Sequence, residues 1–300
     1  MPKPSLTIAI PFHAGIDYLR LALQSVLEQE DAEWKLIVCD DGKQPNQELQ
    51  AFLQGLADPR VRYHRNPEPA GMVANWNLPF GLADTELLTL LHQDDLLLPN
   101  YVGLVREMAV QYPEASAFYT GARIIDHKGE ACFSMADWIK RFLVPGGGAQ
   151  IRLQGSSAVE ALLRGNFIMC PTLCFRRAER LPTPFDARWK QVQDLELLCR
   201  MLMQGSELRG TSELAYAYRR HAQAATAKQS ESLLRFAEEC SLLDDMSERC
   251  VALGWQHAAR IADKKRMIKL HLCYRILGDL MRLRFGRAKA KGVFLWRQMF

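Results

Sequence analysis

The sequence predicts an α/β fold, a mostly parallel sheet flanked by helices, followed by a helical C-terminal region. Short β-rich runs alternate with helical patterns through the first part of the chain. Two of these runs end at paired carboxylates, Asp40-Asp41 and Asp94-Asp95. Beyond about residue 226 the pattern becomes helical and, further on, strongly basic. These features are typical of an α/β domain with a helical appendage.

The strand and helix signals begin at the amino terminus. Residues 6–10 (LTIAI) form a β-rich run that stops at residues 11–13, and apolar positions at helical spacing follow through residue 27. Residues 36–39 (LIVC) are the next predicted strand. Gly42, just after the acidic pair, can adopt the positive φ of a tight turn. The order of strand, helix and strand implies a parallel pair.

The same alternation leads to the second acidic pair. Residues 61–64 are predicted as a strand, residues 71–80 as a helix, and residues 87–92 as the strand before Asp94 and Asp95. Ligands of open α/β sheets bind at the carboxyl ends of strands, and adjacent carboxylates there suit a hard divalent cation with a phosphorylated substrate. An isolated Asp-Asp pair is also a common solvated turn. Two acidic turns at one sheet edge favour a nucleotide-dependent enzyme.

Four motifs make the chain resemble the family 2 glycosyltransferases, a large inverting group built on the GT-A fold. They are IAIPF at residues 8–12, VCDDG at 38–42, GMVANWN at 71–77 and HQDD at 92–95, in that order and at family-like separations. The resemblance covers roughly residues 5–225. It implies transfer of a sugar from a nucleotide-diphospho-sugar, with a UDP-linked donor expected, to a hydroxyl of a saccharide or lipid-linked saccharide.

The resemblance also assigns roles on the donor side. It places six residues along the nucleotide: Pro11, Phe12, Asp40, Asp41, Asn75 and Asp94. Asp40 is expected to accept a hydrogen bond from the base, and Asp94 to approach the ribose or the metal. Asp95 is expected to bind the Mg²⁺ or Mn²⁺ that bridges the two phosphates. His92 stands where many relatives carry a third acidic residue, which leaves the ligand set open.

The general base is expected in a later segment, residues 189–200. Asp194 is the candidate, with Gln193 in place of the acidic residue that commonly precedes the base. Glu196 is the fallback, since two residues further along a helix its side chain points about 200° away. A purely structural role for Asp194 as a helix N-cap is the alternative, and both roles are compatible.

A closing segment, residues 216–226, resembles the family's return to the diphosphate. Arg220 offers a planar fork suited to phosphate, and His221 is expected to bind the metal or to donate to the leaving group. The chemistry implied is direct displacement at the anomeric carbon, with Asp194 taking the acceptor's proton and with inversion of configuration.

Two other classes of protein share part of this pattern. A nicotinamide oxidoreductase is disfavoured because the turn after the first strand, PFHAG, lacks the G-x-G-x-x-G fingerprint. A non-catalytic, glycosyltransferase-like scaffold subunit of a polysaccharide-assembly complex stays open, because His92 and Gln193 both replace common acidic positions.

Composition is consistent with a globular chain. Hydrophobic residues make up 48% of the 300 residues, and the eight cysteines are scattered without a zinc or disulfide pattern. No signal peptide and no membrane-spanning run is found, so a cytoplasmic protein is expected, with peripheral attachment to the inner face of the plasma membrane as an option.

The basic C-terminal tail is the reason to expect peripheral attachment to a membrane as an option. Residues 260–300 contain twelve Lys or Arg and two Asp, so the rest of this chain of net charge +4 is negative. Cations interleaved with apolar residues suit a helix on an anionic leaflet, and equally an ordinary helix packed on the domain. Nucleic acid is disfavoured because no base-stacking platform accompanies the charge.

The expected organisation is a domain over residues 1–226 and a helical, basic appendage over residues 227–300. Within the domain, a nucleotide-binding half extends to about residue 125 and an acceptor half follows. Between them, residues 142–149 (FLVPGGGA) cannot form a stable helix or central strand. This loop is either a lid near the acceptor or a plain surface connection.

Overall fold

The computed structural model describes residues 3–145, 149–177, 184–221 and 233–297. Within these residues one mixed sheet has the strand order β3-β2-β1-β4-β8-β6-β9-β5, and β7 pairs with the far part of β9. The first four strands in this order are parallel, while β8 runs antiparallel to both of its neighbours. The predicted α/β class is therefore confirmed. Residues 146–148 of the glycine-rich loop lie outside the described residues.

The parallel half is built by simple alternation of strands and helices. Its elements are β1 (Leu6–Phe12), α1 (Ile16–Leu27), β2 (Trp34–Asp40), α2 (Gln47–Leu56), β3 (Val61–Arg65), α3 (Met72–Leu82) and β4 (Leu87–Leu90). Every residue of β1 and β4 is buried, because helices cover both faces of the sheet. The carboxyl ends of β1, β2 and β4 therefore meet at one edge, where the paired carboxylates follow.

The second half adds antiparallel strands and further helices. Its elements are β5 (Leu96–Leu97), α4 (Tyr101–Gln111), β6 (Ala115–Ile125), α5 (Met135–Lys140), η1 (Arg141–Leu143), β7 (Gln150–Leu153), α6 (Gly155–Arg164), η2 (Cys170–Thr172), β8 (Leu173–Arg176), α7 (Gln193–Met203) and β9 (Glu207–Arg219). The apolar run at residues 168–175 is thus a 3-10 turn followed by a strand. Pro171 sits in this turn.

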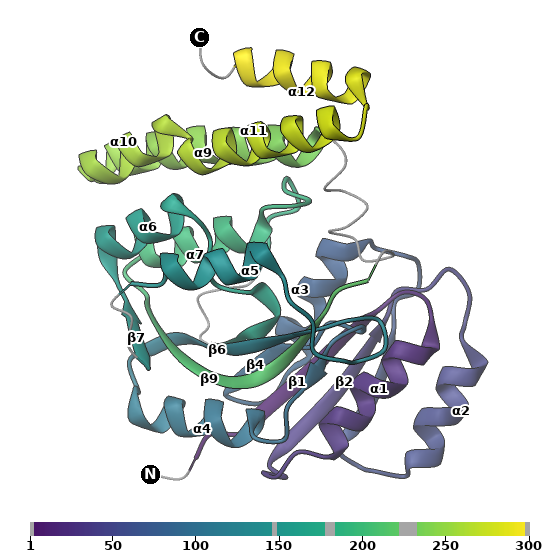
Figure 1. The fold of residues 1–300 in the computed structure, drawn as a ribbon. Coiled ribbons are helices and arrows are strands. Elements are labelled where there is room, and N and C mark those ends of the chain that lie inside the picture. Colours follow the sequence, from purple (N-terminus) through teal and green to yellow (C-terminus); the bar gives the residue numbers. More distant parts are fainter. Residues whose placement is uncertain (1–2, 146–148, 178–183, 222–232, 298–300) are drawn as a thin grey trace.

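Two hydrophobic clusters form the core, one on each face of the sheet. Alternation along β1 separates them, since Ile8 belongs to the cluster under α1 and α4 and Ala9 to the cluster under α6 and α7. In Figure 1, α6 and α7 lie between the sheet and the C-terminal helices. The second cluster continues into those helices through residues such as Met246 and Leu272.

Four helices make up the C-terminal region: α9 (Leu234–Ala252), α10 (Gln256–Lys264), α11 (Arg266–Met281) and α12 (Phe285–Arg297). The basic tail is therefore three helices and not one, because Lys265 and Leu283 adopt positive φ values of 48° and 55° and break it. None of the described helices has the length and apolarity needed to span a membrane.

Helix α9 is joined to α7 by polar contacts as well as by the core. The Glu238 carboxylate accepts hydrogen bonds from the N–H groups of Lys190 and Gln191 at 2.9 and 2.8 Å, just before α7 begins. Arg249 contacts Glu196 of α7 at 3.4 Å. The appendage thus shares a core with the sheet, and α9 fixes the position of α7. The boundary at residue 226 stays a prediction about domains.

We expect Met246→Ala to lower the free energy of unfolding by about 2–5 kcal/mol, because its buried side chain fills the core between α9 and the sheet's helices. Urea unfolding followed by circular dichroism measures the change. Met281→Ala removes the same atoms from an exposed position, and a change of only about 0.5 kcal/mol is expected. Equal effects of the two substitutions would mean that the appendage adds nothing to the core.

Candidate active site

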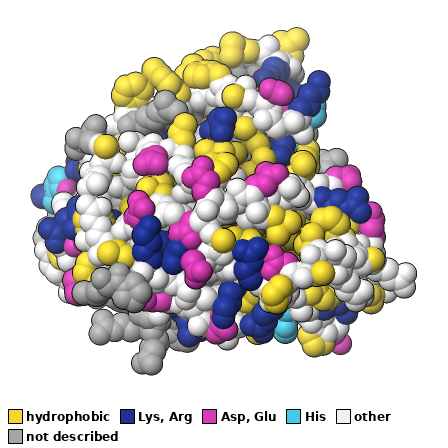
Figure 2. Space-filling model, turned by 90° about the horizontal axis from the view of Figure 1, so that it is seen from below, with side chains coloured by type: hydrophobic (Ala, Val, Ile, Leu, Met, Phe, Trp, Pro, Cys, Tyr) yellow, Lys and Arg dark blue, Asp and Glu magenta, His cyan; other side chains and the backbone are white. Residues whose placement is uncertain are grey.

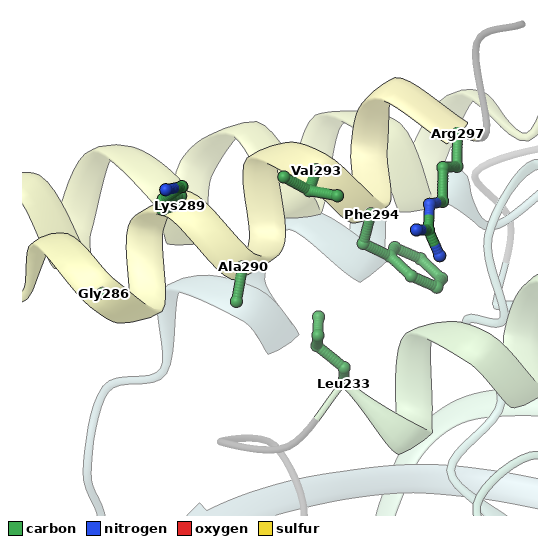
Figure 3. A pocket seen from close by; sticks show the side chains of 7 residues that line it. All are labelled: Leu233, Gly286, Lys289, Ala290, Val293, Phe294 and Arg297. Carbon is green, nitrogen blue, oxygen red and sulfur yellow. The ribbon is translucent and has the colours of Figure 1, made fainter.

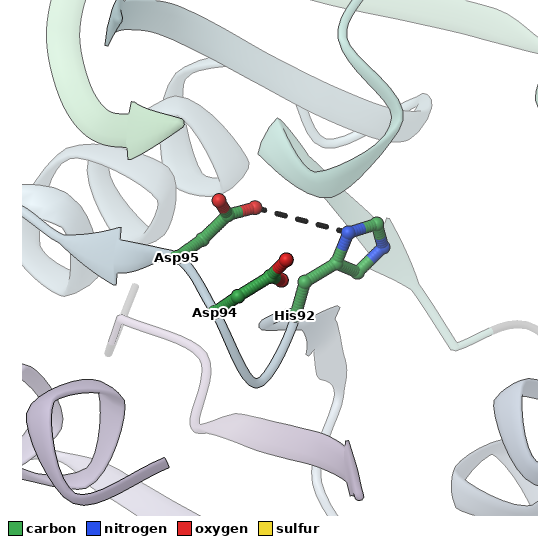
Figure 4. Close-up of side chains that lie close together, drawn as sticks. All are labelled: His92, Asp94 and Asp95. Carbon is green, nitrogen blue, oxygen red and sulfur yellow. Dashed lines mark ion pairs between the residues drawn. The ribbon is translucent and has the colours of Figure 1, made fainter. Parts of the chain in front are cut away.

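A tight turn after β4 carries the carboxylates that are expected to bind the nucleotide and the metal. His92, Asp94 and Asp95 each place one ligand atom within 4.8 Å of the others, a cluster found among the described residues. Figure 4 shows the three side chains projecting from the turn toward one another. The Asp95 Oδ2 atom lies 3.8 Å from His92 Nδ1. His92, which departs from the expected acid, therefore supplies a ligand atom of its own.

Asp95 is held rigidly by strand β9. Its Oδ1 accepts a hydrogen bond of 2.7 Å from the backbone N–H of Arg219, and its Oδ2 accepts one of 3.0 Å from the Tyr216 hydroxyl. Only 1% of Asp95 is exposed. Both donors are available because β9 pairs with β5, which follows the turn directly. The carboxylate thus has a fixed position with one edge left toward Asp94 and His92.

The Arg219 side chain continues this support. It is 2% exposed, and its Nε donates to the Asp94 carbonyl at 2.7 Å while Nη1 donates to the Asp126 carbonyl at 3.0 Å. Its guanidinium also stacks over the Tyr18 ring of α1, 4.8 Å from the ring centroid. One buried cation therefore ties the turn to β6 and α1. No local sequence signal indicates this role, since Arg219 is one of two adjacent arginines.

Two further contacts fix the turn against its neighbours. Gln93 accepts from the His13 N–H at 3.1 Å and donates to the Ala14 carbonyl at 2.7 Å, which joins the ends of β1 and β4. His221 Nε2 lies 2.8 Å from Asp94 Oδ2. The structure therefore brings the predicted His221 to the carboxylates, in contact with Asp94. The rest of the closing segment, residues 222–226, lies outside the described residues.

The electrostatics of the turn favour a bound cation. Burial, together with the neighbouring Asp94 charge, raises the pKa of Asp95 well above its ordinary value. Burial lowers the pKa of His92, which keeps its imidazole neutral and able to offer a lone pair. A divalent cation between these atoms would compensate both carboxylates, and mixed oxygen and nitrogen ligands are suited to ions such as Mn²⁺. The residues present fit a metal site.

The first acidic pair has its oxygens bound inside the protein. Asp40 is fully buried, with Oδ1 accepting from the Gly42 N–H at 2.8 Å and Oδ2 from the Tyr63 hydroxyl at 2.5 Å. Pro11 and Phe12 are buried at the end of β1 beside it. A contact from Asp40 to a nucleotide base stays a prediction, and its hydrogen bonds support the loop that follows β2.

Asp41 organises the start of α3. Its Oδ1 accepts from Asn66 Nδ2 and from the Ala70 N–H, both at 2.7 Å, and its Oδ2 accepts from the Gly71 N–H at 2.8 Å. Asn75 donates to the carbonyls at the ends of β1 and β2 at 3.3 and 3.1 Å. These side chains join the ends of β1 and β2 to α3 by hydrogen bonds. Their expected contact with nucleotide stays a prediction.

The remainder of the GMVANWN motif contacts the loop before α7. Asn77 forms a two-way hydrogen-bond pair with the backbone of Phe185, at 2.8 and 2.9 Å. The Trp76 ring stacks on His92, with centroids 5.0 Å apart and planes 26° apart, and meets Phe185 edge-on at 5.3 Å. Helix α3 therefore links the carboxylate turn to the loop that leads into α7.

Asp194, the candidate base, lies in the first turn of α7. Its Oδ2 accepts a hydrogen bond of 2.9 Å from Asn166, and burial raises its pKa above the ordinary value. Cys170 in η2 is close enough for Asp194 to raise the pKa of its thiol further, after burial. Because β8 is antiparallel to β4, its start lies at the carboxyl end of β4. Asp194 thus belongs to the sheet edge that bears Asp95.

The residues around Asp194 bear on two alternatives, its role as a helix N-cap and Glu196 as the base. Val192 is the N-cap residue of α7 and no side-chain cap is formed, so the N-cap role for Asp194 was wrong. Glu196 is 1% exposed and pairs with Arg200 at 2.9 Å as well as with Arg249. Its charge is used to bind α7 to α9. Gln193 is buried, and its Nε2 has no hydrogen-bond partner among the described residues.

A second carboxylate near Asp194 was missed from the sequence. Burial raises the pKa of Glu239 on α9, and the nearby charge of Asp194 raises it further. The acid-rich pattern of α9 resembles that of any amphipathic helix, so no local signal marked this residue.

Arg220, the predicted diphosphate ligand, is exposed, and its guanidinium lies 5.5 Å from the centroid of the Tyr218 ring.

This arrangement defines a GT-A type glycosyltransferase fold, and solved structures agree. The S. aureus TarS 1-349 structure in complex with UDP-GlcNAc superposes with a TM-score of 0.60 at 11% identity, covering 98% of this chain and 89% of that one. GalNAc-T7 with UDP, GalNAc and Mn²⁺ gives a TM-score of 0.53 at 11% identity, over 73% and 44% of the two chains. At such identities the likeness concerns the fold.

Residues 7–145 match the family model of Glycosyl transferase family 2. Over 98 residues the chain is 35% identical to the putative colanic acid biosynthesis glycosyl transferase WcaA of Escherichia coli (strain K12), covering 33% of this chain and 35% of that protein. An uncharacterized glycosyltransferase of Rickettsia felis is 27% identical over 130 residues, 43% of this chain and 21% of that protein.

The match of residues 7–145 to this family model confirms the resemblance that the four motifs indicated. The chain spans about a third of the length of the first curated relatives that it matches.

Replacing Arg219 tests the support of the carboxylate turn. Arg219→Met leaves the Asp94 and Asp126 carbonyls without their donors, and we expect a loss of about 1–3 kcal/mol for each carbonyl that finds no water. Urea unfolding measures it. Arg62→Met, at an exposed position on β3, is the matched control and is expected to stay within about 0.5 kcal/mol of the parent. A parent-like Arg219→Met would show that other contacts hold the turn.

Proposed function

We propose that the protein is an inverting, metal-dependent glycosyltransferase that moves a sugar from a UDP-linked donor to a hydroxyl of a saccharide or lipid-linked saccharide. One observation carries the proposal: the turn that bears His92, Asp94 and Asp95 stands at the carboxyl end of β4 in a GT-A type fold, with His221 against Asp94. A strand end of this kind is where α/β sheets bind phosphorylated ligands.

Support for the donor comes from the structural neighbours. The TarS structure is a complex with UDP-GlcNAc, and the GalNAc-T7 structure contains UDP, GalNAc and Mn²⁺. The curated relative WcaA is named for colanic acid biosynthesis, which favours an envelope polysaccharide or its lipid-linked precursor as acceptor. A saccharide acceptor bears the hydroxyl groups that the reaction requires.

The metal is proposed to bind at the turn after β4. Asp95 and Asp94 would supply oxygen ligands and His92 a nitrogen ligand, with His221 next to Asp94 as a further candidate. When bound, Mg²⁺ or Mn²⁺ offsets the negative charge of the donor's diphosphate as the leaving group departs. Arg220, two residues after Tyr218 at the end of β9, is proposed to bind a phosphate oxygen through its planar fork.

Asp194 is proposed to act on the acceptor. Asn166 orients its carboxylate, and burial raises its pKa toward the range of an effective base at neutral pH. The acceptor hydroxyl attacks the anomeric carbon opposite the departing diphosphate while Asp194 removes the hydroxyl proton. A single displacement of this kind inverts the configuration and forms no covalent enzyme intermediate.

A scaffold role is the second candidate, because Gln193 replaces a common acidic position beside the base. The buried Asp194 with a raised pKa favours the enzyme. Metal-dependent hydrolysis or transfer from a UDP-sugar by the purified protein separates the two functions, since a scaffold releases no UDP.

Asp95→Asn tests the metal site. The amide keeps the shape of the carboxylate but loses its charge, so we expect the Mn²⁺-dependent part of UDP affinity to fall at least roughly tenfold, as measured by calorimetry with and without the ion. Asp84→Asn removes a carboxylate that is paired with Lys35 on the surface, and it should bind as the parent does. If both variants keep the parent's metal dependence, Asp95 is not a ligand.

Asp194→Asn separates binding from chemistry. The amide oxygen can still accept from Asn166, so we expect near-normal UDP-sugar binding and at least roughly a 10²-fold loss in single-turnover transfer. The donor titration and the transfer rate are measured on the same preparation.

Glu196→Gln is the matched control for this experiment. It removes the charge of the buried Glu196 that pairs with the partly exposed Arg200 and Arg249, so it should lower the free energy of unfolding by about 1–3 kcal/mol, while the folded protein keeps its transfer rate. A large loss of transfer in the Glu196 variant, with parent-like rates for Asp194→Asn, would move the base to Glu196.

A further inference from the structure

Helix α11 exposes an apolar stripe to solvent. Leu270, Tyr274, Leu277 and Met281 are 64%, 70%, 56% and 72% exposed. Their spacing of four, three and four residues places them within an arc of about 60° on one face of the helix, since each residue turns by about 100°. Large apolar side chains gathered on one exposed face indicate an interaction surface.

The stripe is not the face with which α11 packs. Ile268 and Leu272 point the opposite way and are 1% and 0% exposed within the core shared with α9. Helix α11 is therefore apolar on two opposite faces, and the fold uses only one of them. The sequence pattern alone could not show this, because it does not tell which apolar face is covered.

Helix α12 and its connection extend the surface. Leu283, Phe285 and Trp296 are 74%, 62% and 64% exposed. A buried ion pair between Lys291 of α12 and Asp279 of α11 holds the two helices together. In Figure 1 α12 is the outermost element, on the far side of α11 from the sheet. The stripe and these side chains form what we call the hairpin surface, made of residues 270–296.

Basic side chains surround the hairpin surface. Seven exposed cations lie on these helices and their junctions: Lys264, Arg266, Arg282, Arg284, Arg287, Lys289 and Arg297. Among residues 264–297 the acidic side chain is Asp279, which is buried against Lys291. Figure 2 shows a different pattern on the face seen from below, where acidic and basic side chains are interspersed. The hairpin surface thus combines apolar groups with charge of one sign.

A groove beside α12 has the same chemistry. It has a volume of about 440 Å³, and Figure 3 shows Val293, Phe294 and Leu233 on its apolar lining with Lys289 and Arg297 at its edges. An apolar channel with a cation at each end suits a molecule that carries an acyl chain and an anionic head group.

Two occupants suit such a surface, a second copy of this chain and an anionic membrane, and charge distinguishes between them. A second copy of this chain joined through a two-fold axis would bring the cations of both copies together, and like charges at an interface cost affinity. An anionic leaflet instead offers phosphates to the cations and hydrocarbon to the apolar stripe. Tyr274 and Trp296 are the side chains that favour the boundary between the two regions of a membrane.

We propose that the hairpin surface docks the protein on anionic membranes, with the α11 stripe inserted at the boundary between head groups and acyl chains. The surface lies outside the carboxylate site, so docking needs neither donor nor metal. It would hold the enzyme where a lipid-linked acceptor is found. Vesicle binding and sugar transfer are measured separately, and the failure of one proposal is distinguishable from that of the other.

The test is co-sedimentation of the full chain with vesicles of phosphatidylcholine alone and of an equal mixture with phosphatidylglycerol. We expect binding to the mixture and little to the neutral vesicles. Leu277→Asp with Met281→Asp should weaken binding at least roughly tenfold, because two apolar contacts are replaced by repelled charges. Arg282→Glu with Lys289→Glu should weaken it similarly and reduce its sensitivity to salt.

Matched variants control for charge and for exposed apolar groups elsewhere. Leu21→Asp with Val110→Asp changes two exposed apolar residues on α1 and α4, and Arg62→Glu with Lys43→Glu reverses two exposed cations of the sheet domain. Both should bind vesicles more tightly than the corresponding hairpin variants. Circular dichroism and thermal unfolding confirm that every variant is folded.

Two results would overturn the proposal. One is parent-like vesicle binding by the folded Leu277→Asp, Met281→Asp variant, or loss of binding that is equal in the control variants. The other is absence of vesicle binding together with a dimer, seen by light scattering, that this variant dissociates. That second result would assign the hairpin surface to a second copy of the chain.

Discussion

The burial of the Asp95 carboxylate is the constraint on which the site depends. A carboxylate that is 1% exposed needs donors at fixed positions, and strand β9 supplies them through the Arg219 N–H and the Tyr216 hydroxyl. These donors compensate the carboxylate only in part, because burial and then the neighbouring Asp94 charge raise its pKa. The fold therefore keeps a negative site that a divalent cation would stabilise. A metal-binding carboxylate requires a rigidly held position and a negative charge that the protein's own donors do not fully compensate.

The motif residues divide between support and chemistry. Asp41 accepts hydrogen bonds from the backbone just before α3, and Asn75 donates to the carbonyls at the ends of β1 and β2, so their first role is to shape the edge where a nucleotide would bind. Trp76 and Asn77 extend that support to His92 and to the loop before α7. Most residues of these motifs therefore support the site by structural contacts, and they align a few reactive side chains.

Much of the fold could be predicted because the signals were local. The strands β1 and β4 are continuous buried runs, β2 is buried from Leu36 onward, and the acidic pairs after β2 and β4 mark the functional edge without any tertiary information. The role of Arg219 could not be predicted, because it depends on the register of β9 against β5, more than a hundred residues away in sequence. The breaks at Lys265 and Leu283 were equally hidden, since neither residue is a glycine or a proline.

The C-terminal helices connect the candidate base to the rest of the molecule. Glu238 of α9 binds the backbone just before α7, and Arg249 pairs with Glu196 two residues beyond Asp194. Helix α9 therefore supports α7, which bears Asp194. It belongs to the same C-terminal layer as α11 and α12, which carry the hairpin surface. A membrane bound to that surface would be joined to the base through packed helices, with no flexible linker between α9 and α12. The acceptor side of the site would then keep a defined orientation toward the leaflet.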